Sequence, residues 1–255
     1  MAGRIFVAAG TRDGRELAGY ILQKGYQVTA SVVSSYGESL LKSYQGIQVS
    51  CEPMDEEGFA EYFRQHQVDV FVDASHPYAA NVSENAMAAC RRAGVAYIRY
   101  ERQQTPLDYD KAYYVADYQR AAEVAAGLGE RIFLTTGSRK LEAFARSEAL
   151  QGKELVCRIL PEPEVVQLAR DLGFTPANIV AVQGPFSLEL NKELYKKYGA
   201  QVVVTKNSGT AGGADTKFAA AMELGLPLVI IDRPAMQYDN IAYTFEAVVD
   251  FIALQ

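Results

Sequence analysis

Several loops of the sequence combine glycines with hydroxyl and cationic side chains, a combination that is suited to holding an anion. KNSGTAGGADTK (206–217) follows the apolar run 202–204, and TTGSR (135–139) closes the apolar run RIFLTT. Backbone N–H groups, hydroxyls, lysines and arginines all donate hydrogen bonds to carboxylates and phosphates. The candidate anion ligands in these two loops are Thr136, Gly137, Ser138, Arg139, Lys206, Ser208 and Gly209.

A further loop, GTRDGRELA (10–18), has the arrangement of a phosphate-binding turn. Gly10 allows a ligand to approach the backbone, Thr11 offers a hydroxyl, and Gly14 lies where a helix starts. The full GxGxxG fingerprint is absent, so a strand–helix turn without a ligand is the alternative. The next loop has no acid before Glu38 to hold the ribose of NAD. Its serines could instead accept the 2′-phosphate of NADP, with Arg12 or Arg15 nearby, and a polar loop without a ligand is the alternative. The candidate cofactor ligands are Gly10, Thr11, Arg12, Gly14, Ser31, Ser34 and Ser35.

The stretch DASHPYAANVSENA (73–86) places acid–base side chains at the end of another apolar run. Histidine can deliver a proton near neutral pH, and the chain has only two histidines. His66 lies in a polar helical pattern, whereas His76 precedes a helix start, where packing does not readily explain it. We expect His76 or Tyr78 to act as the proton donor of a reaction, with water as the alternative.

Two arginines, Arg99 and Arg102, close the next apolar run. Arginine pairs bidentately with carboxylates, so both are candidate substrate ligands. A pair of ordinary surface arginines is the alternative. Ser75 is a further candidate substrate ligand, with helix capping as its alternative role.

These loops all follow short apolar runs that alternate with helical patterns. The runs are rich in Val, Ile, Phe and Tyr, which indicates strands. They cover residues 4–9, 27–33, 47–50, 68–74, 95–100, 112–116, 131–136, 154–160, 178–183, 201–205 and 226–232. Alternating strands and helices predict mostly parallel sheets flanked by helices, and ligands bind at the carboxyl ends of such strands.

The polar segment ERQQTPLDYDKA (101–112) interrupts the alternation. It contains a proline and has no hydrophobic period, so it marks a domain boundary. We therefore expect two α/β domains, residues 1–106 with the cofactor site and residues 107–255 with the substrate site.

Composition and charge argue against a nucleic-acid-binding or membrane-spanning protein. The 255 residues are 49% hydrophobic and 22% charged, and the formal net charge is -6. An acidic chain of this kind disfavours nucleic acid as a partner. No stretch approaches the roughly 20 apolar residues of a membrane span, and the three cysteines have no zinc spacing. We expect a cytoplasmic protein without a metal site.

The ordered set of motifs resembles a known family. GTRDGRELA, DASHPYAANVSENA, RYER, TTGSRKLEAF, QGPFS, KNSGTAGGADTK and DRP occur in this order along nearly the whole chain. Together they are similar to the precorrin-6A (precorrin-6x) reductases and their cobalt-precorrin-6A counterparts. The chain departs from the usual pattern at Ala9, Asp13, Gln103 and Asn207.

The resemblance implies NADPH-dependent reduction of one carbon–carbon double bond of a macrocycle in the synthesis of the corrin ring. It also implies two Rossmann-like domains with a cleft between them for a tetrapyrrole substrate, in a monomer or homodimer. The acetate and propionate carboxylates of such a substrate are the anions that the cation-bearing loops would bind. A reductase of another small substrate, a non-catalytic dinucleotide sensor and, more distantly, a glycosyltransferase-like protein are the alternatives. The sequence does not distinguish a metal-free from a cobalt-containing substrate.

Overall fold

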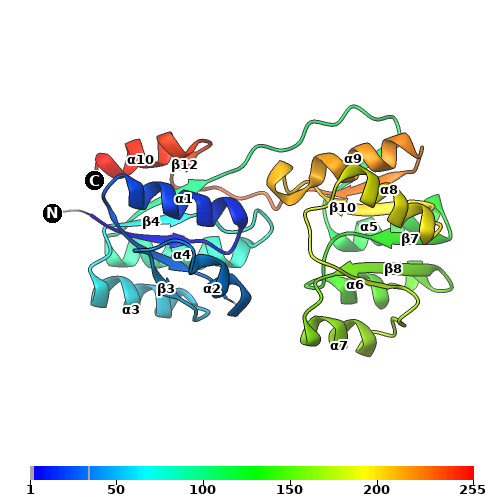
Figure 1. Cartoon of the computed structure of the whole chain (residues 1–255), viewed down its shortest axis with the longest axis horizontal. Helices are drawn as coiled ribbons and strands as arrows, with labels where there is room; N and C mark the ends of the chain where they lie inside the picture. The colour runs from blue at the N-terminus through cyan, green and yellow to red at the C-terminus, as the bar shows by residue number, and fades with distance from the viewer. Residues whose placement is uncertain (1–2, 34) are drawn as a thin grey trace. The chain divides into compact units, whose positions relative to one another are not determined.

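The computed structural model describes residues 3–33 and 35–255. The chain divides into two compact units, Met1–Gln103 with Pro234–Gln255 and Gln104–Arg233. Each unit is built on a 6-stranded parallel sheet with helices on both faces (Figure 1). The predicted α/β class with two Rossmann-like domains is confirmed, and the cleft between them stays a prediction. None of the helices in the described ranges is both long and apolar enough to cross a membrane.

Every predicted apolar run coincides, apart from its ends, with a strand, because β-branched and aromatic residues suit a sheet covered on both faces. The first unit contains β1 (Arg4–Ala8), β2 (Gln27–Ser31), β3 (Gln48–Ser50), β4 (Val70–Asp73), β5 (Ala96–Tyr100) and β12 (Ile241–Ala242). The second contains β6 (Ala112–Val115), β7 (Arg131–Leu134), β8 (Glu154–Ile159), β9 (Ile179–Ala181), β10 (Val202–Lys206) and β11 (Leu228–Ile231).

Polar side chains start several of the helices by capping their free N–H groups. These caps are Thr11, Asp55, Asp117, Ser187 and Thr244. The helices of the first unit are α1 (Arg12–Gln23), α2 (Ser35–Leu41), α3 (Glu56–His66), α4 (Ala80–Ala93) and α10 (Phe245–Ala253). Those of the second are α5 (Tyr118–Leu128), α6 (Leu141–Ala145), α7 (Pro163–Asp171), α8 (Leu188–Lys197) and α9 (Ala214–Glu223), with short 3₁₀ turns at Glu148–Leu150 and Thr210–Gly212.

The first sheet has the strand order β3-β2-β1-β4-β5-β12. This is the order of dinucleotide-binding Rossmann sheets, in which the strand order reverses between the first and fourth strands. Ligands of such sheets bind beside the carboxyl ends of these two strands. The loops that follow β1 and β4 are therefore the expected ligand-binding edge of this unit.

The second sheet has the order β6-β11-β10-β7-β8-β9. Here β7 is followed on one side by β8 and β9, and β10 lies on its other side, paired through Val202↔Ile132 and Val204↔Leu134. The strand order thus reverses between β7 and β10. The loops that leave these two strands are the predicted anion-binding loops, so the topology brings them to one edge.

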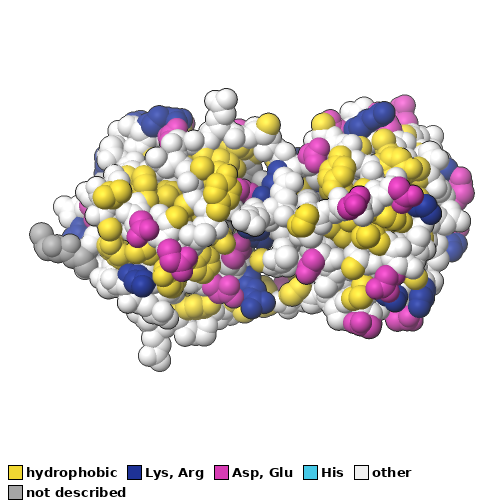
Figure 2. Space-filling view, turned by 90° about the horizontal axis from the view of Figure 1, so that it is seen from above, with side chains coloured by type: hydrophobic (Ala, Val, Ile, Leu, Met, Phe, Trp, Pro, Cys, Tyr) yellow, Lys and Arg dark blue, Asp and Glu magenta, His cyan; other side chains and the backbone are white. Residues whose placement is uncertain are grey.

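The core of the first unit has two layers, one on each face of the sheet. On one face, α1 and α10 pack on the sheet through Leu17, Ile21, Val248 and Ile252. The other face is covered by α3 and α4, and an aromatic cluster fills that layer with Phe6, Phe59, Phe63 and Phe71. In the second unit, α8 and α9 cover the face that carries Phe133 and Val203. On the surface, Figure 2 shows acidic and basic side chains interspersed on the face that it presents.

The division of the chain differs from the predicted boundary between residues 106 and 107. The segment 234–255, predicted as part of the second domain, returns to the first unit. There β12 pairs with β5 through Ile241↔Arg99 and Ala242↔Tyr100, and α10 buries Val248 and Ile252 against the first sheet. The returning strand has only 2 residues, too few to give a recognisable hydrophobic pattern.

Candidate functional site

The loop between β1 and α1 lies where the strand order of the first sheet reverses. Thr11 is the N-cap of α1, and its hydroxyl accepts a hydrogen bond from the backbone N–H of Gly14 (3.1 Å). The same hydroxyl oxygen lies 2.6 Å from Oδ1 of Asp13 and 3.0 Å from the carbonyl oxygen of Ala74, which follows β4. Thr11 thus connects the loop after β1 with the loop after β4. The N-terminus of the 12-residue helix α1 lies at this sheet edge, and a helix N-terminus favours anions.

The two glycines of this loop have different surroundings. A Cβ atom at Gly14 would lie 2.9 Å from the carbonyl oxygen of Ala74 and 3.1 Å from Cα of Ala9, so only glycine fits between α1 and the β4 loop. A Cβ atom at Gly10 would meet nothing within 4 Å, and Gly10 is exposed. Gly14 therefore serves packing, whereas Gly10 leaves open space beside the helix start. This arrangement fits a phosphate group.

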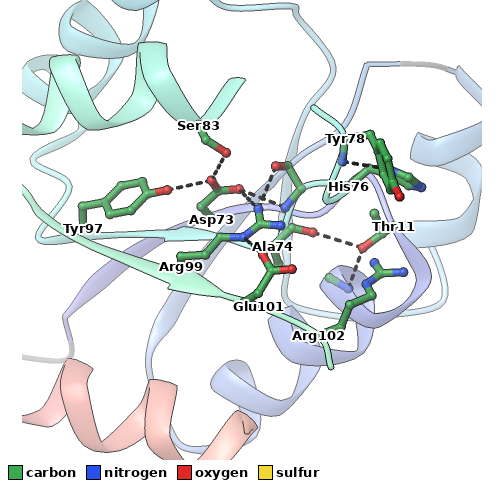
Figure 3. A network of polar contacts seen from close by, with 12 residues as sticks. Thr11, Asp73, Ala74, His76, Tyr78, Ser83, Tyr97, Arg99, Glu101 and Arg102 are labelled. Carbon is green, nitrogen blue, oxygen red and sulfur yellow. Dashed lines mark hydrogen bonds and ion pairs between the residues drawn. The ribbon is translucent and has the colours of Figure 1, made fainter. Parts of the chain in front are cut away.

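Asp73, the last residue of β4, is the centre of a buried polar network (Figure 3). Its Oδ1 accepts hydrogen bonds from Nη1 of Arg99 (2.8 Å) and the backbone N–H of Ser75 (3.0 Å). Its Oδ2 accepts from the hydroxyls of Ser83 (2.5 Å) and Tyr97 (2.7 Å). These contacts fix the start of the loop that carries His76.

The network holds an ionised carboxylate and an ionised guanidinium. Burial opposes the charge of Asp73, but the charge of Arg99 and the hydrogen bonds from Ser83, Ser75 and Tyr97 outweigh it, so its pKa lies below the ordinary value. Burial likewise opposes the charge of Arg99, and Asp73 and other acidic groups outweigh it, so the pKa of Arg99 lies above its ordinary value. Burial first, and then Asp73, raises the pKa of Tyr97, which stays a donor.

The expected contact of Arg99 with a substrate carboxylate is corrected by this geometry. Arg99 is 1% exposed, and its Nε donates to Oε2 of Glu101 (2.8 Å). Its Nη1 also donates to Oγ of Ser75 (3.0 Å), and its guanidinium lies 5.3 Å from the ring centre of Tyr238. Two carboxylates of the protein, those of Asp73 and Glu101, thus already occupy the guanidinium in place of a substrate carboxylate. Arg99 and Ser75 instead position the loop after β4.

Arg102 lies beside the loop after β1. Its Nη2 donates to Oδ1 of Asp13 at 2.5 Å, and both side chains are largely buried. The pair neutralises an acid at the start of α1, where a negative charge would repel an incoming anion. Arg102 was predicted to contact substrate, and the structure places it at the candidate cofactor loop.

The predicted proton donors His76 and Tyr78 lie in the turn between β4 and α4, half-buried. The backbone N–H of Tyr78 donates to Nδ1 of His76 (3.3 Å), which leaves Nε2 to carry the proton of the neutral ring. The two ring centres are 5.7 Å apart. Because the turn follows Ala74, whose carbonyl contacts Thr11, both rings lie at the edge that carries the Gly10 loop (Figure 3).

The predicted site for a 2′-phosphate lies partly within the described residues. Ser31 ends β2, and its carbonyl accepts a hydrogen bond from the N–H of Ala9 (2.8 Å), which brings it next to the loop after β1. Arg12 is exposed on the first turn of α1. Ser35 begins α2, and Ser34 lies outside the described residues. Their contacts with a phosphate stay predictions.

In the second unit, the loop after β7 presents an unpaired hydroxyl at the sheet edge. Thr135 fastens the loop to β10, since its N–H and its hydroxyl both donate to the carbonyl of Val204 (2.9 and 3.0 Å). Thr136 is 5% exposed, and its hydroxyl has no hydrogen-bond partner within the part of the chain that the structure describes. Gly137 has φ +80°, which favours glycine, and Arg139 is exposed.

The loop after β10 is anchored by a side chain that sequence reasoning did not assign. Asn207 accepts from the N–H of Thr105 (3.0 Å), donates to the carbonyl of Thr105 (2.9 Å), and its own carbonyl accepts from Nε of Arg233 (3.0 Å). Burial and the charge of Arg139 lower the pKa of Lys206, which ends β10, to about 8.

The structure thus brings the predicted residues together in two groups, one in each unit. The first-unit group surrounds the loops after β1 and β4 and includes Gly10, Thr11, Arg12, Gly14, Ser31, His76, Tyr78 and Arg102. The second-unit group surrounds the loops after β7 and β10 and includes Thr136, Gly137, Ser138, Arg139, Lys206, Ser208 and Gly209.

Sequence reasoning missed several buried polar residues at these edges. Asp73 was noted only for its position at the end of an apolar run. Its partners Tyr97 and Arg99 are two residues apart on β5, so their side chains lie on the same face of the sheet. Arg158 in the apolar run of β8 and Lys217 in the first turns of α9 were not predicted either. A charged residue inside an apolar strand was the available signal.

Comparisons with known proteins agree with this arrangement. A family model described as "Precorrin-6x reductase CbiJ/CobK" matches residues 4–253. The cobalt-precorrin-6A reductase of Priestia megaterium is 40% identical over 252 residues, 98% of each chain. The precorrin-6A reductase of Rhodobacter capsulatus is 30% identical, covering 98% of this chain and 96% of the relative. A solved structure titled "CobK precorrin-6A reductase" superimposes with a TM-score of 0.79 at 29% identity, over 99% of this chain and 97% of that one.

Proposed function

The chain belongs to the precorrin-6x reductase family, and from this premise we propose that it reduces a carbon–carbon double bond of the precorrin-6A macrocycle with NADPH. The observation that carries the proposal is the first sheet. It has the dinucleotide-binding strand order, and the open Gly10 loop lies beside the start of α1 where that order reverses.

The residues of the first unit fit the cofactor. Gly10 and Thr11 at the start of α1 would hold the pyrophosphate, and Ser31, Arg12 and the serines that follow β2 would hold the 2′-phosphate. The bound cofactor supplies a hydride. The chain's own contribution is to place the reacting groups, and orientation alone can lower a barrier by roughly 7–11 kcal/mol.

His76 is the proposed proton donor. In the neutral ring Nδ1 accepts the N–H of Tyr78, so His76 must first take up a proton and become an imidazolium, with loss of that hydrogen bond, before it can donate one. The loop that carries His76 is fastened by Asp73 and Arg99, which lets the ring keep its position at the sheet edge. Tyr78, with its ring beside that of His76, is the second candidate donor.

The second unit offers groups suited to the carboxylates of a tetrapyrrole. The buried hydroxyl of Thr136 has no hydrogen-bond partner among the described residues, and Arg139 and Lys206 supply positive charge. The backbone at Gly137 and Gly209 adopts φ of +80° and +77°, which leaves no side chain over these loops. Ser138 and Ser208 complete the proposed set. Arg99 is left out of it because Asp73, Ser75 and Glu101 already accept the hydrogen bonds of its guanidinium.

The test is an assay with purified protein, NADPH or NADH, and precorrin-6A in metal-free and cobalt-containing form. Oxidation of NADPH that depends on one macrocycle supports the proposal and identifies the substrate form. NADPH binding with no reduction of either macrocycle contradicts it and favours a dinucleotide sensor. Reduction that proceeds equally well with NADH contradicts the 2′-phosphate assignment.

We expect Gly10→Ala to weaken NADPH binding without unfolding the protein. A methyl group at Gly10 would occupy open space, so the free energy of unfolding should change by less than about 0.5 kcal/mol. The Kd for NADPH, measured by calorimetric titration, should rise roughly tenfold or more because the backbone can no longer approach the pyrophosphate.

Gly14→Ala is the matched comparison, since its methyl group would lie 2.9 Å from the carbonyl oxygen of Ala74. We expect this variant to lose about 1–3 kcal/mol of stability in urea denaturation. A Gly10→Ala protein that binds NADPH like the wild type would contradict the role given to the loop.

A further inference from the structure

Two cations of the second unit, Arg158 and Lys217, lie close to the candidate anion-binding residues but are not among the residues assigned to the cofactor or the substrate. Arg158 on β8 is 6% exposed, and its Nη1 donates to Oδ1 of Asn191 on α8 at 2.7 Å. Its guanidinium lies 4.3 Å from the ring centre of Phe186. These contacts hold the group in place, and its other N–H groups have no acceptor within the described part of the chain.

Lys217 on α9 is the second cation, and its charge interacts with that of Arg158. Neither Lys217 nor Arg158 forms an ion pair with a carboxylate of the described residues. Burial, and then the charges of Arg158 and Lys206, lower the pKa of Lys217 to about 7, and only the exposed Asp215 acts in the opposite sense. Arg158 is buried and Lys217 is half-buried, and removing cations from water without a counter-ion is unfavourable. An anion from outside the chain would relieve this cost.

An unsatisfied hydroxyl beside Arg158 is an independent sign of a missing ligand. Tyr195 on α8 is 1% exposed, and its Oη has no hydrogen-bond partner within the described ranges. Burial raises its pKa to about 12, opposed by the charge of Arg158, so the phenol remains a donor. Buried tyrosine hydroxyls normally find a partner. The group that the cluster lacks is therefore an oxygen acceptor.

The backbone around the cluster favours the same class of ligand. α9 begins at Gly213 without a side-chain cap, and this glycine has φ +65°. A Cβ atom there would lie 3.5 Å from Cβ of Pro185 and 3.9 Å from Cε of Lys217, which places the loop after β9 beside the start of the helix. The positive end of this 10-residue helix adds to the charge of the two cations.

We propose that Arg158, Lys217 and Tyr195 form a subsite for one carboxylate side chain of the tetrapyrrole substrate. The subsite rests on the proposed reductase function, since it assigns these residues to that macrocycle. The guanidinium offers paired N–H groups to the carboxylate, the ammonium adds charge, and the phenol supplies a further hydrogen bond. A phosphate of the cofactor has related chemistry and is the competing ligand, although the Gly10 loop in the first unit already provides a phosphate site.

The first test compares Arg158→Met and Lys217→Met with Lys197→Met, which removes an exposed lysine at the end of α8. The subsite predicts that the KM for the macrocycle rises roughly tenfold or more in the first two variants. The KM for NADPH, kcat and the kinetics of Lys197→Met should stay close to wild type, because a carboxylate away from the reacting carbon contributes uniform binding. An increase confined to the KM for NADPH would assign the cluster to the cofactor and overturn the proposal.

A second test distinguishes direct contact from a structural role. Above about pH 7 the side chain of Lys217 is mostly a neutral amine in the free protein, and a bound carboxylate raises the pKa of Lys217. Binding of uroporphyrin, a tetrapyrrole with acetate and propionate groups, should therefore take up a proton at about pH 8 and take up less at about pH 6. Calorimetry in buffers with different ionisation enthalpies measures this uptake. Lys217→Met should reduce the uptake to the part that Lys206, whose pKa is lowered to about 8, contributes, and equal uptake in wild type and variant would overturn the role of Lys217.

The two proposals can fail separately. If the wild type reduces neither macrocycle but binds uroporphyrin through Arg158 and Lys217, the reductase function fails and the anion subsite stands. If the wild type reduces precorrin-6A and both variants match it in KM, the subsite fails and the reductase stands. Arg158→Lys keeps the charge but loses the paired N–H groups, so it tests the same contact if Arg158→Met does not fold.

Discussion

Replacing Arg99 with methionine is expected to lower the free energy of unfolding by about 3–5 kcal/mol. The substitution leaves the carboxylate of Asp73, 0% exposed, without the charge that compensates its burial. It also removes the hydrogen bonds that Arg99 donates to Ser75 and Glu101. The hydrogen bonds from Ser83 and Tyr97 remain, but they do not replace a full charge in a buried site.

Urea denaturation of Arg99→Met against Arg91→Met measures this effect. Arg91 forms an exposed ion pair with Asp239, and the loss of such a pair costs at most about 1 kcal/mol. The double variant Arg99→Met with Asp73→Asn should recover part of the loss, since it removes the uncompensated charge. Equal stability of Arg99→Met and Arg91→Met would show that the network is not the support described here.

The same network predicts how wild-type stability depends on pH. The pKa of Asp73 is lower in the folded protein than its ordinary value of 3.8. Around these pKa values the unfolded chain therefore binds more protons than the folded protein. The stabilisation from Asp73 is fully present above a pH of about 3.8 and is lost as the pH falls through the lower pKa of the folded protein. Asp73→Asn should weaken this loss at acid pH.

The second large effect is expected at His76. His76→Ala should lower kcat for reduction of the macrocycle by roughly 100-fold or more, because it removes the proton donor from the sheet edge. The Kd for NADPH should remain near the wild-type value, since the pyrophosphate is assigned to the Gly10 loop. Stopped-flow measurement of NADPH oxidation over a range of pH separates this step from binding.

The other histidine of the chain provides the control. His66 is exposed at the end of α3, where its ring stacks on Tyr62 at 3.9 Å. His66→Ala should keep the wild-type kcat and pH profile. If His76→Ala also keeps both, the proton comes from another group, and Tyr78→Phe becomes the next variant to measure.

Much of the fold could be predicted from the sequence because parallel strands covered on both faces give short, continuous apolar runs. The loops that end these runs were equally visible, since glycine, hydroxyl and cationic residues stand out between them. The return of 234–255 to the first unit could not be predicted in this way. Its strand has 2 residues, and pairing between Ile241 and Arg99 depends on the whole fold.

The roles of individual cations were harder to predict than their positions. Arg99 and Arg139 look alike in the sequence, as cations after an apolar run. The structure buries Arg99 against Asp73, which ends the neighbouring strand β4, and leaves Arg139 exposed in the loop after β7, whose neighbouring strands end in Ile159 and Lys206. A role for Arg158 on β8 and Lys217 on α9 could likewise be proposed only once the fold showed that their charges interact.

A single-turnover reaction with NADPH deuterated at C4 of the nicotinamide tests the central claim most directly. The purified protein is mixed with the labelled cofactor and precorrin-6A in metal-free and cobalt-containing form, and the mass of the isolated macrocycle is measured. The account predicts that the reduced product of one substrate form carries the deuterium from one face of the nicotinamide. A macrocycle that stays unreduced, or a reduced one in which neither C4 position contributes deuterium, would contradict it.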